Sequence, residues 1–311
     1  VTSRSIDQIN KGRYVVLGGG GLLLPDSNPN NVSGWQWAIS DEQLDSINVP
    51  LIVYAIGYNF FPGQVPTELF VNSVKKLVDK AAFFSLRNRG SIEQLISLIG
   101  ESYRDKIHFQ PCPTTLIRQF SDIPAKNKSK NIAVNIAFDR YQLRFGENIY
   151  TILDEVAKAL KNIESYGYSI HNACHLTNDK KFELVLDKHK VNYTSVDLQY
   201  TTPIETYQFY NNMEVVMGSR GHAQMIPFGL NSKIISLGTH NKLKWFLDDI
   251  DCTDWFVNLR EDIMTIEDRI FGVFEQLVGS KESEDRIIAK QEELHKITTD
   301  NLGKINSIIN P

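Results

Sequence analysis

One short segment of the sequence places an arginine and a histidine, Arg220 and His222, two residues apart. Arginine binds planar or phosphoryl anions through two parallel hydrogen bonds, and histidine exchanges protons near neutral pH. An apolar strand before Arg220 and an apolar helix after His222 are predicted to position both side chains, together with Ser219 and Gly221. The segment therefore predicts anion binding combined with proton transfer; its alternative is a purely structural arginine and histidine.

A second segment carries two arginines and a serine, Arg87, Arg89 and Ser91, between a predicted strand over 82–86 and a predicted helix over 91–99. Ser91 is expected to cap this helix. Because a helix N-terminus with nearby arginines favours negative charge, the segment is a candidate binding point for a phosphate or carboxylate. The alternative is a pair of surface arginines beside an ordinary helix cap.

Four consecutive glycines, Gly18, Gly19, Gly20 and Gly21, follow a predicted apolar strand over 14–17. Glycine lets backbone N–H groups approach a ligand closely, at a cost in conformational entropy. The run matches neither the dinucleotide-binding pattern G-x-G-x-x-G nor the phosphate loop that ends in Gly-Lys-Ser/Thr. We expect its backbone to face a ligand, and a tight strand-to-loop turn is the alternative.

Two weaker signals follow other predicted strands. Lys242 comes shortly after a strand predicted over 234–237, where it would add a cation to the candidate site or lie in a solvated loop. His171, Cys174 and His175 have the spacing of a metal-binding pair on a helix. They lie in a predicted strand end, where that spacing does not converge, so no metal site is predicted.

Short apolar runs alternate with longer helical patterns along the chain, which is typical of parallel sheets covered by helices. The predicted strands are 14–17, 51–56, 82–86, 107–109, 132–138, 168–173, 215–218 and 234–237. The predicted helices are 67–80, 91–99, 150–163, 180–189, 204–211, 221–228 and a charged amphipathic tail.

A polar stretch over 122–131 is the expected linker between two such α/β halves. We therefore predict an N-terminal Rossmann-like domain (1–124), a C-terminal Rossmann-like domain (125–279) and an amphipathic helix (280–311). Ligands of such sheets bind beyond the carboxyl ends of the strands, so a cleft between the two domains is the expected site.

The composition sets limits on the class of protein. The chain has 311 residues, of which 42% are hydrophobic, and a formal net charge of −4. This balance indicates a folded globular protein and excludes a generally basic nucleic-acid binder. No apolar run approaches the ~20 residues that a membrane-spanning helix needs. Three scattered cysteines do not predict a disulfide framework, so a reducing, cytoplasmic compartment is expected.

Taken together, these segments resemble the polysaccharide pyruvyl transferase family. The resemblance covers Tyr14 to about Leu247 and rests on five segments in this order: VVLGGGGLLL, LIVYAIGYN, FSLRNRGSIEQL, QPCPTTL and GSRGHAQMIPFGLNSKIISLGTHNK. It implies a fold like that of the GT-B glycosyltransferases, with two Rossmann-like domains facing a cleft, the second binding the donor, and a long C-terminal helix.

The resemblance also implies an activity: transfer of pyruvate from phosphoenolpyruvate to a sugar of a cell-surface polysaccharide or its lipid-linked precursor, forming a ketal and releasing phosphate. His222 and Arg220 match the family's donor-site histidine and arginine and would be catalytic. The residues expected to bind substrate are Arg87, Arg89, Ser91, Gly18, Gly19, Gly20, Gly21, Asn59, Ser219, Gly221 and Lys242. Phosphoenolpyruvate is then a substrate, and no cofactor, metal or nucleic acid is implied. A lipid-linked acceptor would bring the protein to the inner face of the cell membrane.

The sequence departs from the family at three points. Members have a further strand–loop segment with glycine and asparagine before the first strand, so the N-terminal domain is expected to lack it. Asn88 and Cys112 stand where members often have acidic residues. Two alternatives remain: a GT-B glycosyltransferase with a nucleotide-sugar donor, for which Glu205 and Glu214 are the candidate ribose ligands, and a non-catalytic glycan-binding protein of the same fold.

Overall fold

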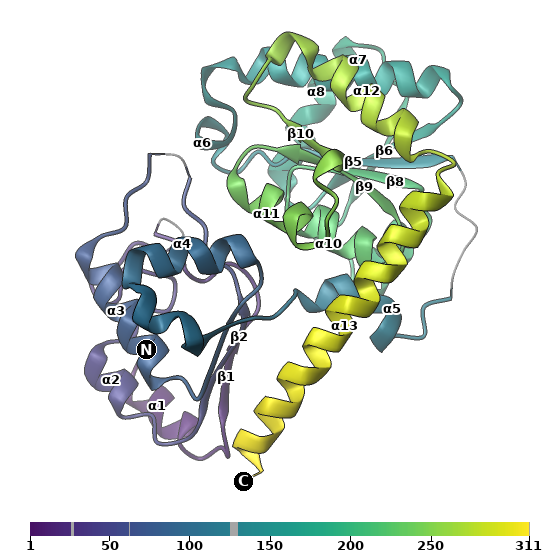
Figure 1. Cartoon of the computed structure of the whole chain (residues 1–311). Coiled ribbons are helices and arrows are strands. Elements are labelled where there is room, and N and C mark those ends of the chain that lie inside the picture. Colours follow the sequence, from purple (N-terminus) through teal and green to yellow (C-terminus); the bar gives the residue numbers. More distant parts are fainter. Residues whose placement is uncertain (26–27, 62, 125–129, 311) are drawn as a thin grey trace. The chain divides into compact units, whose positions relative to one another are not determined.

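The computed structural model describes residues 1–25, 28–61, 63–124 and 130–310. The chain forms two compact units, each an α/β structure built on a parallel sheet (Figure 1). Unit 1 contains Val1–Cys112 and Leu294–Pro311, and unit 2 contains Pro113–Glu293. The predicted class, α/β with two parallel-sheet domains, is confirmed.

The sheet of unit 1 has four strands in the order β1-β2-β3-β4. They are β1 (Val15–Gly18), β2 (Leu51–Ile56), β3 (Phe83–Leu86) and β4 (Ile107–Phe109). The helices are α1 (Ser3–Ile9), α2 (Asp41–Asp45), α3 (Glu68–Lys80) and α4 (Arg89–Ile99). Apolar residues of α3 at helical spacing, Phe70, Val74 and Leu77, are buried in the core of this unit.

The C-terminal helix α13 (Lys281–Ile309) belongs in part to each unit. Within unit 1, its Ile305 packs with Ile52 and Phe83 on the sheet. Within unit 2, the amide of Gln291 donates a hydrogen bond to the carbonyl of Phe228. The predicted tail helix is therefore present and packs on its own chain. Among the described residues, no helix combines the length and the apolar character that crossing a membrane requires.

The sheet of unit 2 has six parallel strands in the order β10-β9-β8-β5-β6-β7. They are β5 (Asn131–Asn135), β6 (Ser169–Cys174), β7 (Tyr193–Asp197), β8 (Val215–Gly218), β9 (Lys233–Gly238) and β10 (Phe256–Asn258). The helices are α5 (Ile117–Phe120), α6 (Tyr141–Phe145), α7 (Ile149–Ser165), α8 (Glu183–Lys188), α9 (Pro203–Asn211), α10 (His222–Gly229), α11 (Asn241–Asp249) and α12 (Ile266–Leu277). Helices α7 and α12 pack together on one face of the sheet, and α10 and α11 cover the other (Figure 1).

The strand order of unit 2 reverses between β5 and β8. From β5 the chain adds β6 and β7 on one side, and it then adds β8, β9 and β10 on the other. In open parallel sheets, ligands bind beyond the carboxyl ends of the strands at such a point. The loops after β5, β6, β8 and β9 are therefore the part of unit 2 where a site is expected.

The division between the units lies earlier than the polar stretch 122–131 suggests. Unit 2 begins at Pro113, because the short 3₁₀ helix Pro113–Leu116 packs against α10, with the Thr114 backbone in direct contact with Gly229. The polar stretch thus follows a segment that already belongs to unit 2, and its residues 125–129 lie outside the described residues.

Helix α4 begins earlier than predicted. Asn88, rather than Ser91, is its N-cap residue. Ser91 lies inside the helix, where its buried hydroxyl donates to the carbonyl of Tyr58 at 3.4 Å. The predicted helix 180–189 is divided into the 3₁₀ helix Thr177–Phe182 and α8. Strands β7 and β10 are absent from the sequence prediction, because both are short edge strands with incomplete apolar patterns.

Candidate functional site

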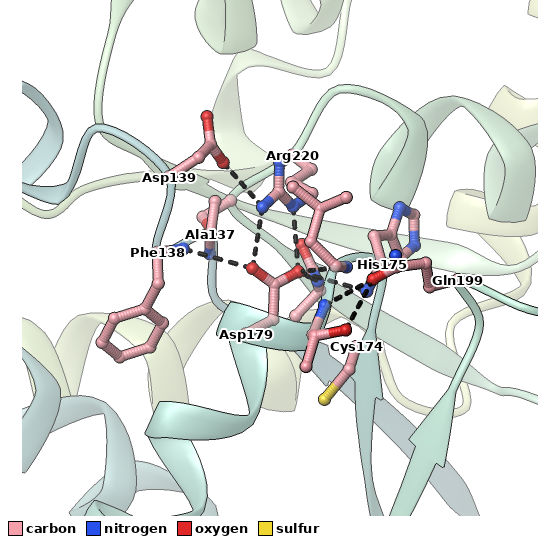
Figure 2. Close-up of polar contacts among 12 residues, drawn as sticks. Ala137, Phe138, Asp139, Cys174, His175, Asp179, Gln199 and Arg220 are labelled. Carbon is pink, nitrogen blue, oxygen red and sulfur yellow. Dashed lines mark hydrogen bonds and ion pairs between the residues drawn. The ribbon is translucent and has the colours of Figure 1, made fainter.

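The carboxyl edge of the unit 2 sheet holds Arg220 against two carboxylates, Asp139 and Asp179 (Figure 2). The Nε of Arg220 donates to Oδ2 of Asp179 at 3.0 Å, and Nη2 donates to Oδ1 at 2.7 Å. The same Nη2 lies 2.6 Å from Oδ1 of Asp139. Because the three residues follow β8, β5 and β6, this arginine joins three loops of the sheet edge.

Asp179 is the buried anchor of this arrangement, with a side chain 1% exposed. Besides Arg220, its carboxylate accepts hydrogen bonds from the backbone N–H groups of Phe138, His175 and Leu176 at 3.1–3.2 Å. These donors replace the hydrogen bonds from water that the carboxylate loses on burial. Asp179 therefore holds Arg220 in one orientation.

Asp139 is shared between two arginines. Nη2 of Arg144, a buried residue of α6, donates to Oδ2 of Asp139 at 3.1 Å, and Nε donates to the Asp139 carbonyl at 2.8 Å. Burial by itself would raise the pKa of Asp139, but the charges of Arg144 and Arg220 outweigh it and lower the pKa below its usual value. The carboxyl is therefore ionised at neutral pH.

The edge as a whole is cationic. Lys242 lies beside the loop of Arg220, since its Cε is 3.8 Å from the position that a Cβ on Gly221 would occupy. Arg140 lies 3.8 Å from Asp139. The positive side chains are Arg140, Arg144, Arg220 and Lys242, and the carboxylates are Asp139 and Asp179. Together these four cations and two anions have a net formal charge of +2. Such a surface favours an anion.

His240, which precedes α11, is a neutral member of this edge. Its Nδ1 lies 3.0 Å from Oγ1 of Thr239. Burial, followed by the positive charges of Arg144 and Lys242, holds the pKa of His240 well below its usual value. The imidazole therefore adds no charge to the edge at neutral pH.

His222 is the first residue of α10 and lines a cavity of about 320 Å³ within unit 2. A proton donor must reach the ligand directly, and the cavity gives this imidazole such access. Ser219 and Gly221, which are predicted to bind substrate, make contacts within the protein. Ser219 Oγ accepts from the N–H of Ala137 at 2.7 Å, and the carbonyl of Gly221 accepts from the N–H of Met225.

A second histidine, His175, lines the same cavity. Its Nε2 lies 2.6 Å from the hydroxyl of Tyr210, which is fully buried. Burial, followed by the positive charge of Arg220, lowers the pKa of His175 to about 4. At neutral pH this side chain is an uncharged imidazole held by a phenol.

Arg87, directly after β3 in unit 1, is a buried cation without an acidic partner among the described residues. The residue is 4% exposed. Within the described residues its side chain makes no hydrogen bond or salt bridge, and its Nε is buried without an acceptor. Burial lowers the pKa of its guanidinium. Because an unpaired buried charge is costly, this arginine is suited to binding an anion.

The glycine run lies next to Arg87. Gly20 and Gly57 are joined by a backbone hydrogen bond of 2.9 Å, from the Gly57 N–H to the Gly20 carbonyl. A Cβ on Gly57 would lie 2.8 Å from Nη2 of Arg87, so the guanidinium packs directly on this glycine. Gly19 and Gly20 have φ angles of +81° and +67°, which only glycine adopts readily. The structure thus brings the glycine run and Arg87 together at one end of the unit 1 sheet.

The other unit 1 candidates are placed differently. Arg89 is exposed, and its guanidinium stacks on the ring of Phe109 at 4.1 Å. Ser91 is buried inside α4. Asn59 is 6% exposed, and its N–H donates to the carbonyl of Leu23.

The carboxylates of the nucleotide-sugar alternative have other roles. Glu205 accepts from the N–H and the hydroxyl of Thr202 at 2.7 and 2.8 Å, and so caps its own helix α9. Glu214 precedes β8, at the edge of the sheet opposite to Arg220. His171 contacts Asn131 rather than His175. Within the described part of the chain, no three His, Cys, Asp or Glu side chains form a candidate metal site.

Sequence reasoning did not select Asp139, Asp179, Arg144 or Tyr210. The position of Asp139 is a usable signal, because it directly follows the predicted strand 132–138. A polar residue just after a buried parallel strand lies at the carboxyl edge of the sheet, where ligands bind. Asp179 lies at the start of a predicted helix, where an acidic residue is unremarkable. The spacing of His175 from His171 suggests only a metal ligand.

Comparison with solved structures shows the class of fold. The chain is similar to the UDP-GlcNAc 2-epimerase from Neisseria meningitidis bound to UDP-GlcNAc, with 13% identity and a TM-score of 0.59 over 99% of this chain and 80% of that one. It is also similar to the Methanocaldococcus jannaschii UDP-GlcNAc 2-epimerase in complex with UDP-GlcNAc and UDP, with 15% identity and a TM-score of 0.54 over 92% and 78%. The chain is therefore a two-unit α/β protein with a GT-B-like fold.

A family model narrows this class. The model described as polysaccharide pyruvyl transferase matches residues 1–241. The chain belongs to the polysaccharide pyruvyl transferase family, which confirms the resemblance drawn from its motifs. A search of curated proteins found no match.

Proposed function

We propose that this protein transfers the pyruvyl group of phosphoenolpyruvate to a sugar of a cell-surface polysaccharide or its lipid-linked precursor, with release of phosphate. Membership of the polysaccharide pyruvyl transferase family supports a transferase of this class. The single observation that carries the choice of donor is Arg87, a buried guanidinium with no acidic partner among the described residues.

Phosphoenolpyruvate matches the chemistry of such a residue. It carries a phosphate and a carboxylate, and guanidinium binds either group bidentately. Gly57 leaves room for the guanidinium, and the glycine run beside it offers backbone N–H groups. In unit 2, the cationic edge with Arg220 and Lys242 has the sign that an anionic donor needs.

The proposed reaction begins with a proton from His222 to the methylene carbon of phosphoenolpyruvate, which becomes a methyl group. The neighbouring carbon then becomes electrophilic, and two hydroxyl oxygens of one sugar bond to it in turn. The carbon–oxygen bond to phosphate breaks with its electron pair on phosphate, whose departure the arginines stabilise. Of the two hydroxyl protons, one restores His222 and the other leaves with phosphate or solvent.

The test is turnover by the full chain with phosphoenolpyruvate and a panel of methyl glycosides. We expect phosphate release matched by a pyruvyl-sized mass gain on a glycoside. His222→Gln should lower this rate by at least about 100-fold, the usual contribution of a general acid, without loss of thermal stability. His189→Gln is the matched control, because Nε2 of His189 lies 2.8 Å from Asp154 and the residue is outside the cavity wall.

Thermal shift separates this proposal from its alternatives. Stabilisation by phosphoenolpyruvate that is lost in Arg87→Gln supports the assignment. Stabilisation by UDP but not by phosphoenolpyruvate would favour a nucleotide-sugar donor. If neither compound binds and no glycoside gains mass, the protein is not a transferase of this kind.

A further inference from the structure

The cavity beside His222 differs in character from the cationic edge next to it. The described residues of its wall belong to unit 2 and come from the 3₁₀ helix Pro113–Leu116, the loops after β6 and β7, and helices α9 and α10. Its volume of about 320 Å³ lies at the lower end of the range for small-molecule sites, which suits a ligand of one ring.

The wall offers uncharged hydrogen-bonding groups and apolar surface. The polar groups come from Thr114, Gln199, Thr206 and the two imidazoles, and Leu198 and Ile226 supply apolar contact. No aspartate, glutamate, lysine or arginine is among the described residues that form it. This mixture is what the hydroxyls and the C–H face of a sugar ring require, and it lacks the charges that a phosphate or carboxylate would select.

The hydroxyl of Tyr210 determines which ring nitrogen of His175 carries the proton. Tyr210 is fully buried, and its hydroxyl lies 2.6 Å from Nε2 of His175. A buried O–H needs an acceptor, and the unprotonated Nε2 is the acceptor at hand. The proton of the neutral ring is then on Nδ1, which leaves His175 with one N–H donor for another partner.

Gln199 and Thr206 are also held by neighbours. Oε1 of Gln199 accepts from the N–H and the hydroxyl of Thr177 at 2.6 and 2.9 Å, which orients the amide. Oγ1 of Thr206 lies 2.8 Å from Oγ1 of Thr201. Gln199, Thr206 and His175 are thus oriented before a ligand arrives, which reduces the entropy cost of binding.

From this arrangement we propose that the cavity is the acceptor subsite: it binds one uncharged hexopyranose ring, and the Nδ1–H of His175 donates a hydrogen bond to an oxygen of that ring. The inference rests on the proposed function, because it assigns the sugar of that reaction to a place beside His222. Tyr210 is then a positioning residue that acts through His175.

The test is ligand-observed NMR on the full chain without phosphoenolpyruvate, using methyl glycosides of uncharged hexoses, glucuronic acid and uridine as separate probes. We expect binding of at least one uncharged glycoside and weaker binding of glucuronic acid. His175→Gln and Thr206→Val should each lower the affinity for that glycoside about three- to tenfold, which is the effect of losing one hydrogen bond. His171→Gln, on β6 just before the loop of His175 but outside the cavity wall, should leave the affinity for that glycoside unchanged.

Tyr210→Phe tests the positioning role separately. In the wild type, the ¹⁵N shifts of His175 should show the proton on Nδ1, whereas the Phe variant should show a mixture of tautomers and a weaker glycoside affinity. A loss of packing alone would not alter the tautomer. Should Tyr210→Phe unfold the chain, Thr206→Val still tests the subsite, with Thr194→Val, an exposed residue of β7 outside the cavity wall, as its control.

Three results would overturn the inference: binding of uridine but of no hexoside, binding of no probe, or hexoside affinity that neither His175→Gln nor Thr206→Val alters. Its failure is distinguishable from failure of the proposed function. If turnover with phosphoenolpyruvate occurs but Thr206→Val leaves the KM for the acceptor unchanged, only the subsite is wrong. If hexosides bind as expected but phosphoenolpyruvate gives no product, the subsite stands and the donor is wrong.

Discussion

His175 should make the protein less stable in mild acid, by an amount that follows from its pKa. The pKa is about 4 in the folded chain and about 6.5 in an unfolded one. Between these values the unfolded state binds more protons, so stability falls as the pH falls through this window. Between about pH 7.5 and about pH 5, this one imidazole should remove about 2 kcal/mol from the free energy of unfolding.

The assay is urea unfolding of wild type and His175→Gln across that pH range. Other half-buried or buried histidines, His108, His171 and His240, also have lowered pKa values and contribute to the wild-type slope. The quantity to compare is therefore the difference between the two proteins at each pH, in which those contributions cancel. We expect this difference to shift by about 2 kcal/mol in favour of the variant between neutral pH and about pH 5.

Parallel curves for the two proteins would refute this reasoning. They would mean that His175 titrates alike in the folded and unfolded chains, so that neither the cavity wall nor Arg220 excludes its charged form. The neutral, tautomer-fixed imidazole on which the acceptor subsite depends would then be lost as well.

Two other predictions concern Arg220 and Arg87. Asp179→Asn should lower the free energy of unfolding in urea by about 3 kcal/mol, because it removes the buried carboxylate that pairs with Arg220. The control Asp45→Asn, in the exposed pair with Lys76, should lower it by less than about 1 kcal/mol. Equal losses would contradict the role of Asp179 as a buried anchor. Gly57→Ala should lower the free energy of unfolding by about 1–3 kcal/mol, because its Cβ would lie 2.8 Å from the Arg87 guanidinium. This loss should disappear in the double variant with Arg87→Ala. A loss that persists there would mean that the added methyl group clashes with another residue.

The strands of both sheets were largely predictable, because buried parallel strands are continuous apolar runs. Residues 51–56, 107–109 and 215–218 were predicted with the bounds that β2, β4 and β8 have. The edge strands β7 and β10 were not, since a strand with one exposed side carries too few apolar residues. The start of α4 was placed at Ser91 because a serine before acidic and amide residues resembles a cap, whereas tertiary packing buries that serine.

Side-chain partners across the sheet were beyond the reach of sequence reasoning. Arg220 and Asp179 are 41 residues apart, and their pairing depends on the order in which β5, β6 and β8 lie in the sheet. Local spacing carries no signal for such a contact. The sequence predicts an arginine after a strand, but it does not show whether a carboxylate from another loop lies close enough to form an ion pair with it.

That difference separates Arg87 from Arg220, two of the arginines that the motifs singled out. Nε and Nη2 of Arg220 are already bound to Asp179 and Asp139, so much of its charge is compensated before any ligand arrives. Arg87 has no such partner among the described residues. Burial of its charge therefore lowers the stability of the folded chain, and a bound anion would offset this loss. A ligand anion should therefore gain more from Arg87 than from Arg220, whereas removing Arg220 should mainly loosen the three loops that it joins. The two variants should differ in kind: Arg87→Gln should lose the thermal shift by phosphoenolpyruvate with little loss of stability, and Arg220→Gln should lose stability first.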